Sequence, residues 1–132
     1  MRTIIVLFVL LFASCNQSAI KKQLSGADSI VIHFNDPQTN TIKKTVATAE
    51  NNAINRLSEF VDAKDSELYK CGYDGNMIFY AKGEKKMDIS FQYTNDSCRH
   101  FIFDMNGELK ASKMSNEAAD FFKSLAEGKN QY

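Results

Sequence analysis

The sequence predicts an α+β fold in which an antiparallel sheet of about six strands carries two helices packed on one face. Apolar and polar residues alternate along six stretches of the chain, which is the periodicity of half-buried strands. Two other stretches repeat apolar residues every three or four positions, as amphipathic helices do. The order along the chain is ββα, ββ, ββα. Since the apolar side of each helix must be buried, we expect both helices to pack on one face of the sheet. The opposite face should then be partly exposed to solvent.

The first unit is a hairpin followed by a helix. From Ser29 every second residue is apolar, which predicts a strand, and residues 35–37 predict the turn after it. Residues 41–47 form a second strand that pairs back on the first. The period then changes, which predicts a helix beginning near Thr48 or Ala49. The apolar stripe of this helix is Ala53, Ile54, Leu57, Phe60 and Val61.

Two further hairpins and a second helix follow. Residues 82–85 offer a tight turn for the first hairpin, and Asn106-Gly107 suits the second because both residues tolerate a positive φ. Ser115 can cap the last helix, whose stripe is Ala118, Phe121, Phe122 and Leu125. The four strands are expected over residues 77–81, 87–93, 98–105 and 108–114.

The amino terminus has the features of a secretory signal. Arg2 precedes an apolar run over residues 4–13, and small residues lead to Cys15. A helix of this length would span about 15 Å, half of a bilayer's hydrocarbon core of about 30 Å, so a retained transmembrane anchor is too short. The run Phe12-Ala13-Ser14-Cys15 resembles the lipobox of bacterial lipoproteins, although Leu is commoner at the position of Phe12.

The lipobox resemblance implies a lipid-anchored protein of the bacterial cell envelope. Cys15 would become the acylated amino terminus, and acyl chains on it would hold the chain on a membrane. In some bacteria an Asp directly after the lipidated cysteine retains a lipoprotein in the inner membrane. Asn16 stands at this position, which weakly favours the outer membrane. An ordinary signal peptide cut elsewhere is the alternative. The expected organisation is a signal peptide (1–14), a lipidated cysteine and flexible tether (15–27), one α+β domain (28–128) and a tail (129–132).

Charge and length exclude several classes of function. The chain has 16 basic and 16 acidic side chains, and losing Arg2 with the signal peptide leaves a net charge of about −1. No basic stripe marks a nucleic-acid-binding surface, so we expect no nucleic acid partner. The length suits one domain with one core, and we expect a monomer.

The two remaining cysteines predict a disulfide. With Cys15 assigned to lipid, Cys71 and Cys98 form an even pair in a compartment where disulfides persist. The bridge would clamp the entry of the central hairpin, and closing such a loop stabilises by roughly 3.5 kcal/mol on the chain-entropy model. Two buried free thiols are one alternative. A zinc site formed with His33 and His100 is another, but only one of the required short spacings is present. We therefore expect no metal or other cofactor.

No catalytic motif stands out. The chain lacks a nucleophile elbow, a His-Glu-x-x-His helix and a glycine-rich phosphate loop. A thiol or hydrolase-like enzyme using Cys71, Asp74 and His100 is an alternative only if Cys71 stays reduced.

The segment around residues 68–75 is the candidate binding loop. Two glycines bracket Tyr73 and Asp74, and a bridge at Cys71 would fix the loop before a partner arrives, which lowers the ordering cost of binding. On the adjoining strand, Ile78 and Tyr80 are expected to extend an apolar patch on the uncovered sheet face. We thus expect a binding or inhibitory module with a protein or small-ligand partner. Two other interpretations remain open. Tyr73 only packs over the disulfide in the first, and the protein is a purely structural envelope component in the second.

Overall fold

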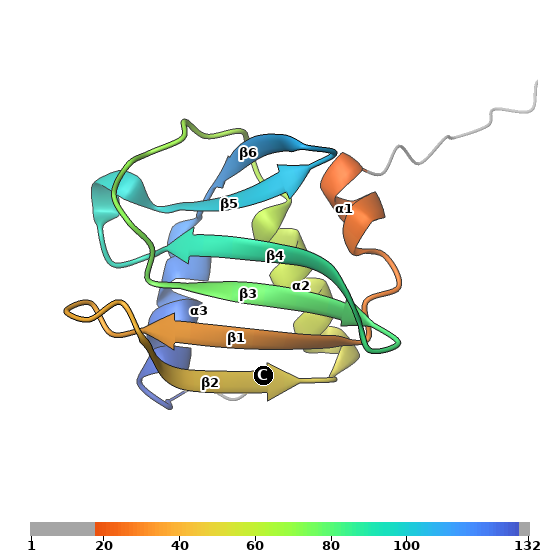
Figure 1. Ribbon diagram of the computed structural model, residues 1–132, viewed down its shortest axis with the longest axis horizontal. Coiled ribbons are helices and arrows are strands. Elements are labelled where there is room, and N and C mark those ends of the chain that lie inside the picture. The colour runs from red at the N-terminus through yellow and green to blue at the C-terminus, as the bar shows by residue number, and fades with distance from the viewer. Residues whose placement is uncertain (1–17, 130–132) are drawn as a thin grey trace, which may run out of the picture.

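A single antiparallel sheet forms the centre of the protein. The computed structural model describes residues 18–129. Its six strands lie in the order β2-β1-β3-β4-β5-β6, and every neighbouring pair is antiparallel (Figure 1). The sheet and its helices confirm the predicted α+β class. The strands are β1 (Ser29–Asn35), β2 (Ile42–Thr48), β3 (Gly75–Ala81), β4 (Glu84–Gln92), β5 (His100–Met105) and β6 (Glu108–Lys113).

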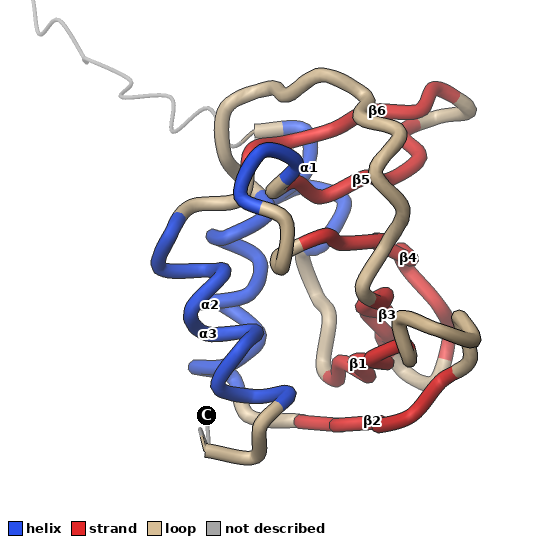
Figure 2. Tube along the Cα trace, turned by 90° about the vertical axis from the view of Figure 1, so that its left-hand side faces the viewer, coloured by secondary structure: helices blue, strands red, loops and turns tan. Residues whose placement is uncertain are grey.

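Two helices of eleven residues cover one face of the sheet. Figure 2 shows α2 (Asn51–Val61) and α3 (Asn116–Ala126) on the same side. As expected, Ser115 caps α3, because its side chain accepts a hydrogen bond of 3.1 Å from the Ala118 amide. The buried residues of α2 are Ala53, Ile54, Leu57 and Val61, and those of α3 are Ala118, Ala119, Phe121, Phe122 and Leu125.

Aromatic side chains fill the layer between helices and sheet. Phe122 of α3 is fully buried and stacks on Phe91 of β4, with 4.5 Å between the ring centroids. The ring centroid of Phe101 in β5 lies 5.9 Å from that of Phe122. Phe34 of β1 meets Phe91 edge-on, with 5.7 Å between the ring centroids. Such ring pairs add to the stabilisation from burial alone. These rings therefore pack α3 against the central strands of the sheet.

The other face of the sheet is covered only in part. After α2, residues 62–74 run along the outer edge of β6, where the Ser66 amide bonds to the Ala111 carbonyl at 3.0 Å. The segment then crosses in front of β5 on its way to β3 (Figure 1). It covers His100 and Ile102, which are buried although they face away from the helices. The part of this face over β1, β3 and the start of β4 stays open.

A third, short helix corrects the expected tether. α1 (Ala19–Leu24) begins at Ser18, whose side chain accepts a hydrogen bond from the Lys21 amide. Ile20 and Leu24, one turn apart, are both buried in the core. The expectation of a flexible segment up to residue 27 is therefore wrong from Ser18 onward, because two apolar residues at helical spacing are enough to dock this segment. Cys15 and the expected signal peptide (1–14) lie outside the described residues.

Some boundaries also differ from the sequence-based expectation. α2 begins at Asn51, not near Thr48, because Thr48 still pairs with Ile30 at the end of β2. β4 is longer than expected and starts at Glu84. Cys98 lies in a 3₁₀ turn, η1 (Asp96–Cys98), so β5 begins only at His100.

Candidate functional site

The loop of residues 71–75 is tied down from several sides. Its backbone joins β4 and β1 at Asp74, whose amide bonds to the Phe91 carbonyl and whose carbonyl accepts from the Asn35 amide, both at 2.8 Å. At its start, the Cys71 carbonyl accepts from the Gln92 side chain at 3.5 Å. The loop is therefore ordered by the sheet on which it lies.

The Asp74 carboxylate holds the loop against the next turn. One oxygen accepts hydrogen bonds from the amides of Tyr93 and Thr94, at 2.7 and 2.9 Å, and the Thr94 hydroxyl also donates to the carboxylate. Charge-assisted bonds of this kind are stronger than neutral ones. The side chain of Asp74 is thus occupied in holding two segments together. It leaves Tyr73, one residue earlier, in a fixed position.

Cys71 and Cys98 lie close enough to form the expected disulfide. The two sulfurs are within bonding distance and the Cα atoms are 6.3 Å apart, which suits a bridge. The bridge links the loop to η1 across 27 residues. Together with the contacts of Gln92 and Asp74, it gives the loop restraints at both ends.

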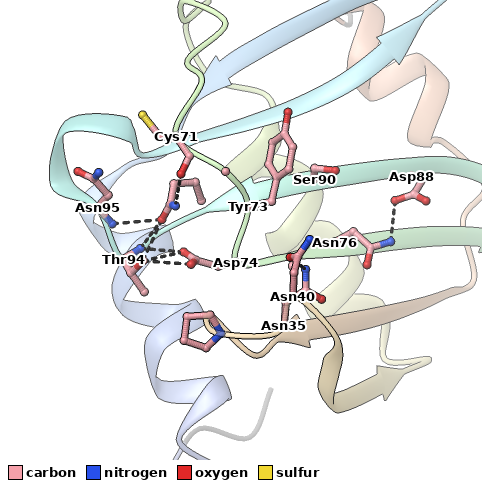
Figure 3. A pocket seen from close by; sticks show the side chains of 14 residues that line it. Asn35, Asn40, Cys71, Tyr73, Asp74, Asn76, Asp88, Ser90, Thr94 and Asn95 are labelled. Carbon is pink, nitrogen blue, oxygen red and sulfur yellow. Dashed lines mark hydrogen bonds between the residues drawn. The ribbon is translucent and has the colours of Figure 1, made fainter.

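An open cavity of about 720 Å³ lies beside this loop, on the sheet face opposite the helices. Its floor comes from β3 and β4, one wall from the loop and the other from the turn between β1 and β2 (Figure 3). The volume is in the range of small-molecule sites. The cavity is lined by Asn35, Pro37, Asn40, Cys71, Gly72, Tyr73, Asp74, Gly75, Asn76, Asp88, Ser90, Gln92, Thr94 and Asn95.

Two side-chain pairs organise the polar floor and wall. The Asn76 amide donates to the Asp88 carboxylate at 2.9 Å, across the β3–β4 pair. Asn35 donates to Asn40 at 3.4 Å, across the turn. Each pair uses one edge of its amide and leaves the other edge for a ligand. Ser90 lies on the floor beside Asn76, its partner in the β3–β4 register.

Tyr73 stands at the rim of the cavity. The residue is 44% exposed, and its ring centroid lies 6.4 Å from that of His100. Tyr69 contacts the same imidazole edge-on at 5.4 Å, so two tyrosines cover the fully buried His100. Tyr73 therefore packs on one side and presents the rest of its ring to solvent.

The structure brings some of the candidate residues together and separates others. Tyr73 and Asp74 line the cavity, whereas Tyr80 lies at the far end of β3, beside Ser29 of β1, and does not line it. The patch expected to join Tyr80 to the loop is therefore not continuous with the cavity. Its own half-buried side chain shares the open face with Ile78.

Three residues of the enzyme and zinc alternatives make other contacts. Cys71 is paired with Cys98, the Asp74 carboxylate holds residues 93–94, and His100 bonds through Nδ1 to the Cys98 carbonyl. Within residues 18–129, no three His, Cys, Asp or Glu side chains gather as a metal site would require.

Several residues that line the cavity could not be identified from the sequence alone. Asn35, Asn76, Asp88 and Ser90 come from three strands and meet only through the register of β1, β3 and β4. In the sequence, Asp88 and Ser90 are polar members of an alternating strand. Asn35 falls in a predicted turn, and Asn76 precedes the strand predicted over residues 77–81. Only the pairing of the strands shows that they gather.

The pKa of Tyr93, next to the site, is raised. Burial of the phenol is the main cause, and the negative charges of Asp74 and Glu127 act in the same direction. Tyr93 packs against Phe34, Phe91 and Phe122, so its ring belongs to the core below the turn that Asp74 holds.

Comparison with known proteins adds no relative: no family model, curated protein or solved structure matches this chain. The helices within residues 18–129 are too short or too polar to cross a bilayer.

Proposed function

We propose that this chain is a small envelope lipoprotein, anchored to a membrane by lipid on Cys15, whose domain is a non-catalytic binding module. The lipobox-like run ending at Cys15 supports the anchor. An oxidised Cys71–Cys98 pair in the same compartment fits this location. The binding role is supported by the loop and cavity on the open sheet face.

The observation that carries the binding role is the ordered loop that presents Tyr73. Four independent restraints hold residues 71–74: the disulfide, the Gln92 amide, the Asp74 carboxylate and the backbone bonds to β1 and β4. A loop that is already ordered loses little conformational entropy when it binds. Tyrosine offers a large contact area with few rotatable bonds, which suits recognition.

The placement of the cavity agrees with an anchored binder. α1, which follows the anchor region, lies at one end of the sheet, whereas the β1–β2 turn and the loop lie at the other (Figure 1). A membrane attached through Cys15 would therefore leave the cavity accessible.

Site-directed photo-crosslinking in cells tests this role. A photoreactive benzoylphenylalanine is placed at Tyr73 in the full-length protein, and the irradiated protein is purified from membranes for mass spectrometry. We expect one or a few discrete adducts, because the side chain at this position lies at the rim of the site. The same replacement at Tyr80 is the matched control, since Tyr80 shares the strand face but lies outside the cavity.

The outcome decides the binding role directly. Adducts at position 73 that are absent at position 80 support it. Equal labelling at both positions, or no labelling at position 73, would leave the loop without a binding role and contradict the proposal.

A further inference from the structure

The chemistry of the cavity indicates the class of its ligand. Small-molecule sites are usually lined mostly by apolar side chains. This cavity instead has four asparagines, a glutamine, a serine, a threonine and two aspartates among its fourteen lining residues. A ligand that fits must therefore be polar over much of its surface, since an apolar one would leave these groups without partners.

The charge of the lining residues disfavours anionic ligands. The two carboxylates of Asp74 and Asp88 contribute negative charge, and Lys, Arg and His are absent from the described lining. Phosphates, nucleotides and carboxylates are typically bound through cationic side chains, and none lines this cavity. A cationic ligand finds only one carboxylate available for direct contact, because the Asp74 oxygens already accept hydrogen bonds from Tyr93 and Thr94, which leaves Asp88.

The free hydrogen-bonding edges match hydroxyl groups. Asn76 donates to Asp88, which leaves the Asn76 carbonyl oxygen and the second Asp88 oxygen as acceptors on the floor. Asn35 donates to Asn40, which leaves the Asn35 oxygen as an acceptor and the Asn40 amide as a donor on the wall. Since hydroxyls both donate and accept, a ligand with several neighbouring hydroxyls can satisfy both pairs.

Tyr73 supplies an apolar surface at the edge of this polar set. Figure 3 shows its ring projecting from the loop on the same side as Ser90, with Asn76, Asn40 and Asn35 along the floor and far wall. A ligand with polar edges and an apolar face would use both kinds of contact. A pyranose ring has this combination: hydroxyls around its edge and C–H groups on its face.

From these observations we propose that the cavity binds a neutral saccharide. The pairs Asn76–Asp88 and Asn35–Asn40 bond to its hydroxyls, and Tyr73 packs on the face of one ring. This inference rests on the proposed function and specifies the ligand of the same site. The openness of the cavity toward solvent fits an internal segment of a glycan chain as well as an end.

A glycan array tests the ligand class. The full-length protein in detergent is fluorescently labelled and applied to an array of neutral oligosaccharides (glucans, mannans, xylans and N-acetylglucosamine oligomers) with sulfated and uronic-acid glycans beside them. We expect binding to at least one neutral class and none that is restricted to acidic glycans. Asn76→Ala and Tyr73→Ala should each weaken the binding about tenfold, which is what one or two lost contacts typically change.

Two further variants keep the result interpretable. Asn76→Asp has nearly the same shape but places a second carboxylate beside Asp88, so it should also weaken binding. Tyr80→Ala, on the same strand and face but outside the cavity, should bind like wild type. Circular dichroism and thermal unfolding establish that each variant is folded. Binding lost equally in Tyr80→Ala, or unchanged in both Asn76 variants, would overturn the assignment.

The array and the crosslinking experiment fail in different ways. If no neutral glycan binds, and the adduct at position 73 is a protein or a lipid, the saccharide assignment is wrong while the binding role stands. If position 73 forms no adduct, the binding role itself is wrong.

Discussion

At the scale of single residues, Gly75 decides how closely the loop can approach the sheet. It is buried at the first position of β3, between Phe34 of β1 and Phe91 of β4. A Cβ atom there would overlap the His33 carbonyl oxygen and approach the Phe91 ring to 2.8 Å. The backbone oxygen cannot move without shifting β1. Only glycine therefore fits where the candidate loop joins the sheet.

We predict that Gly75→Ala destabilises the domain by about 1–3 kcal/mol through overpacking at this junction. Urea unfolding followed by circular dichroism measures the change. Gly83→Ala would not be a fair control, because Gly83 has a positive φ. Ala81→Gly at the other end of β3 is a better one and should cost about 1 kcal/mol or less. A Gly75→Ala protein as stable as wild type would contradict the steric argument.

Tyr93 gives a second prediction, for alkaline pH. Since burial and the charges of Asp74 and Glu127 raise its pKa, the native state keeps the phenol proton at a pH where the unfolded chain has lost it. The unfolded state then binds fewer protons, so the free energy of unfolding contributed by Tyr93 falls as pH rises above about 10. Below about 10 the contribution is fully present.

Tyr93→Phe should remove this component and keep the packing on Phe34, Phe91 and Phe122. The measurement is urea unfolding of both proteins from about pH 8 to about pH 11. The wild-type protein should lose stability relative to the variant at the alkaline end, although lysines titrate equally in both. A stability difference independent of pH would show that Tyr93 ionises alike in both states.

At the scale of elements, α1 shows how few residues are needed to dock a segment. It makes one turn and a half, has a single side-chain cap at Ser18, and buries only Ile20 and Leu24. A helix this short has little stability alone, so its order comes from packing against α2 and β4. It is part of the domain, not a spacer.

We therefore predict that Leu24→Ala costs about 2–4 kcal/mol of unfolding free energy, as large-to-small changes at buried leucines do. Leu24 is only 3% exposed. Gln23→Ala, next to it and exposed, serves as the control and should change little. Thermal or urea unfolding gives both values. If the two variants were equally stable, this segment would be the flexible tether that the sequence alone suggests.

The elements also show what can be predicted from sequence. The alternation of apolar and polar residues was sufficient to predict the strands, because one face of the sheet is buried. Asn106-Gly107 correctly indicates the β5–β6 turn, where both residues have positive φ. α1 could not be predicted because its two buried apolar residues, Ile20 and Leu24, are too few to establish a helical periodicity. The cavity could not be predicted because Asn76 precedes the predicted strand and Ser90 occupies an ordinary solvent-facing position, and only the β3–β4 register brings them together.

At the scale of the whole molecule, the start of α1 limits how far the domain can lie from its proposed anchor. Three peptide units join Cys15 to Ser18, where the described structure begins, and a fully extended chain of that length spans about 11 Å. If Cys15 carries lipid, the α1 end of the sheet lies close to the membrane surface. The β1–β2 turn and the loop of residues 71–75, which line the cavity, lie at the opposite end (Figure 1).

Removing the acceptor of the lipid tests this arrangement. We predict that Cys15→Ser shifts the protein from the membrane fraction and abolishes incorporation of labelled palmitate, because no residue in 18–129 forms a membrane-spanning helix that could replace the lipid. Intact mass of wild-type protein from membranes should show an acylated chain beginning at Cys15. The Cys71→Ser, Cys98→Ser double variant is the matched control, since it removes the other two thiols and should keep both the label and the membrane location. A Cys15→Ser protein that stays on membranes with its label, or a wild-type protein that begins at Met1, would contradict the anchor and with it the envelope location.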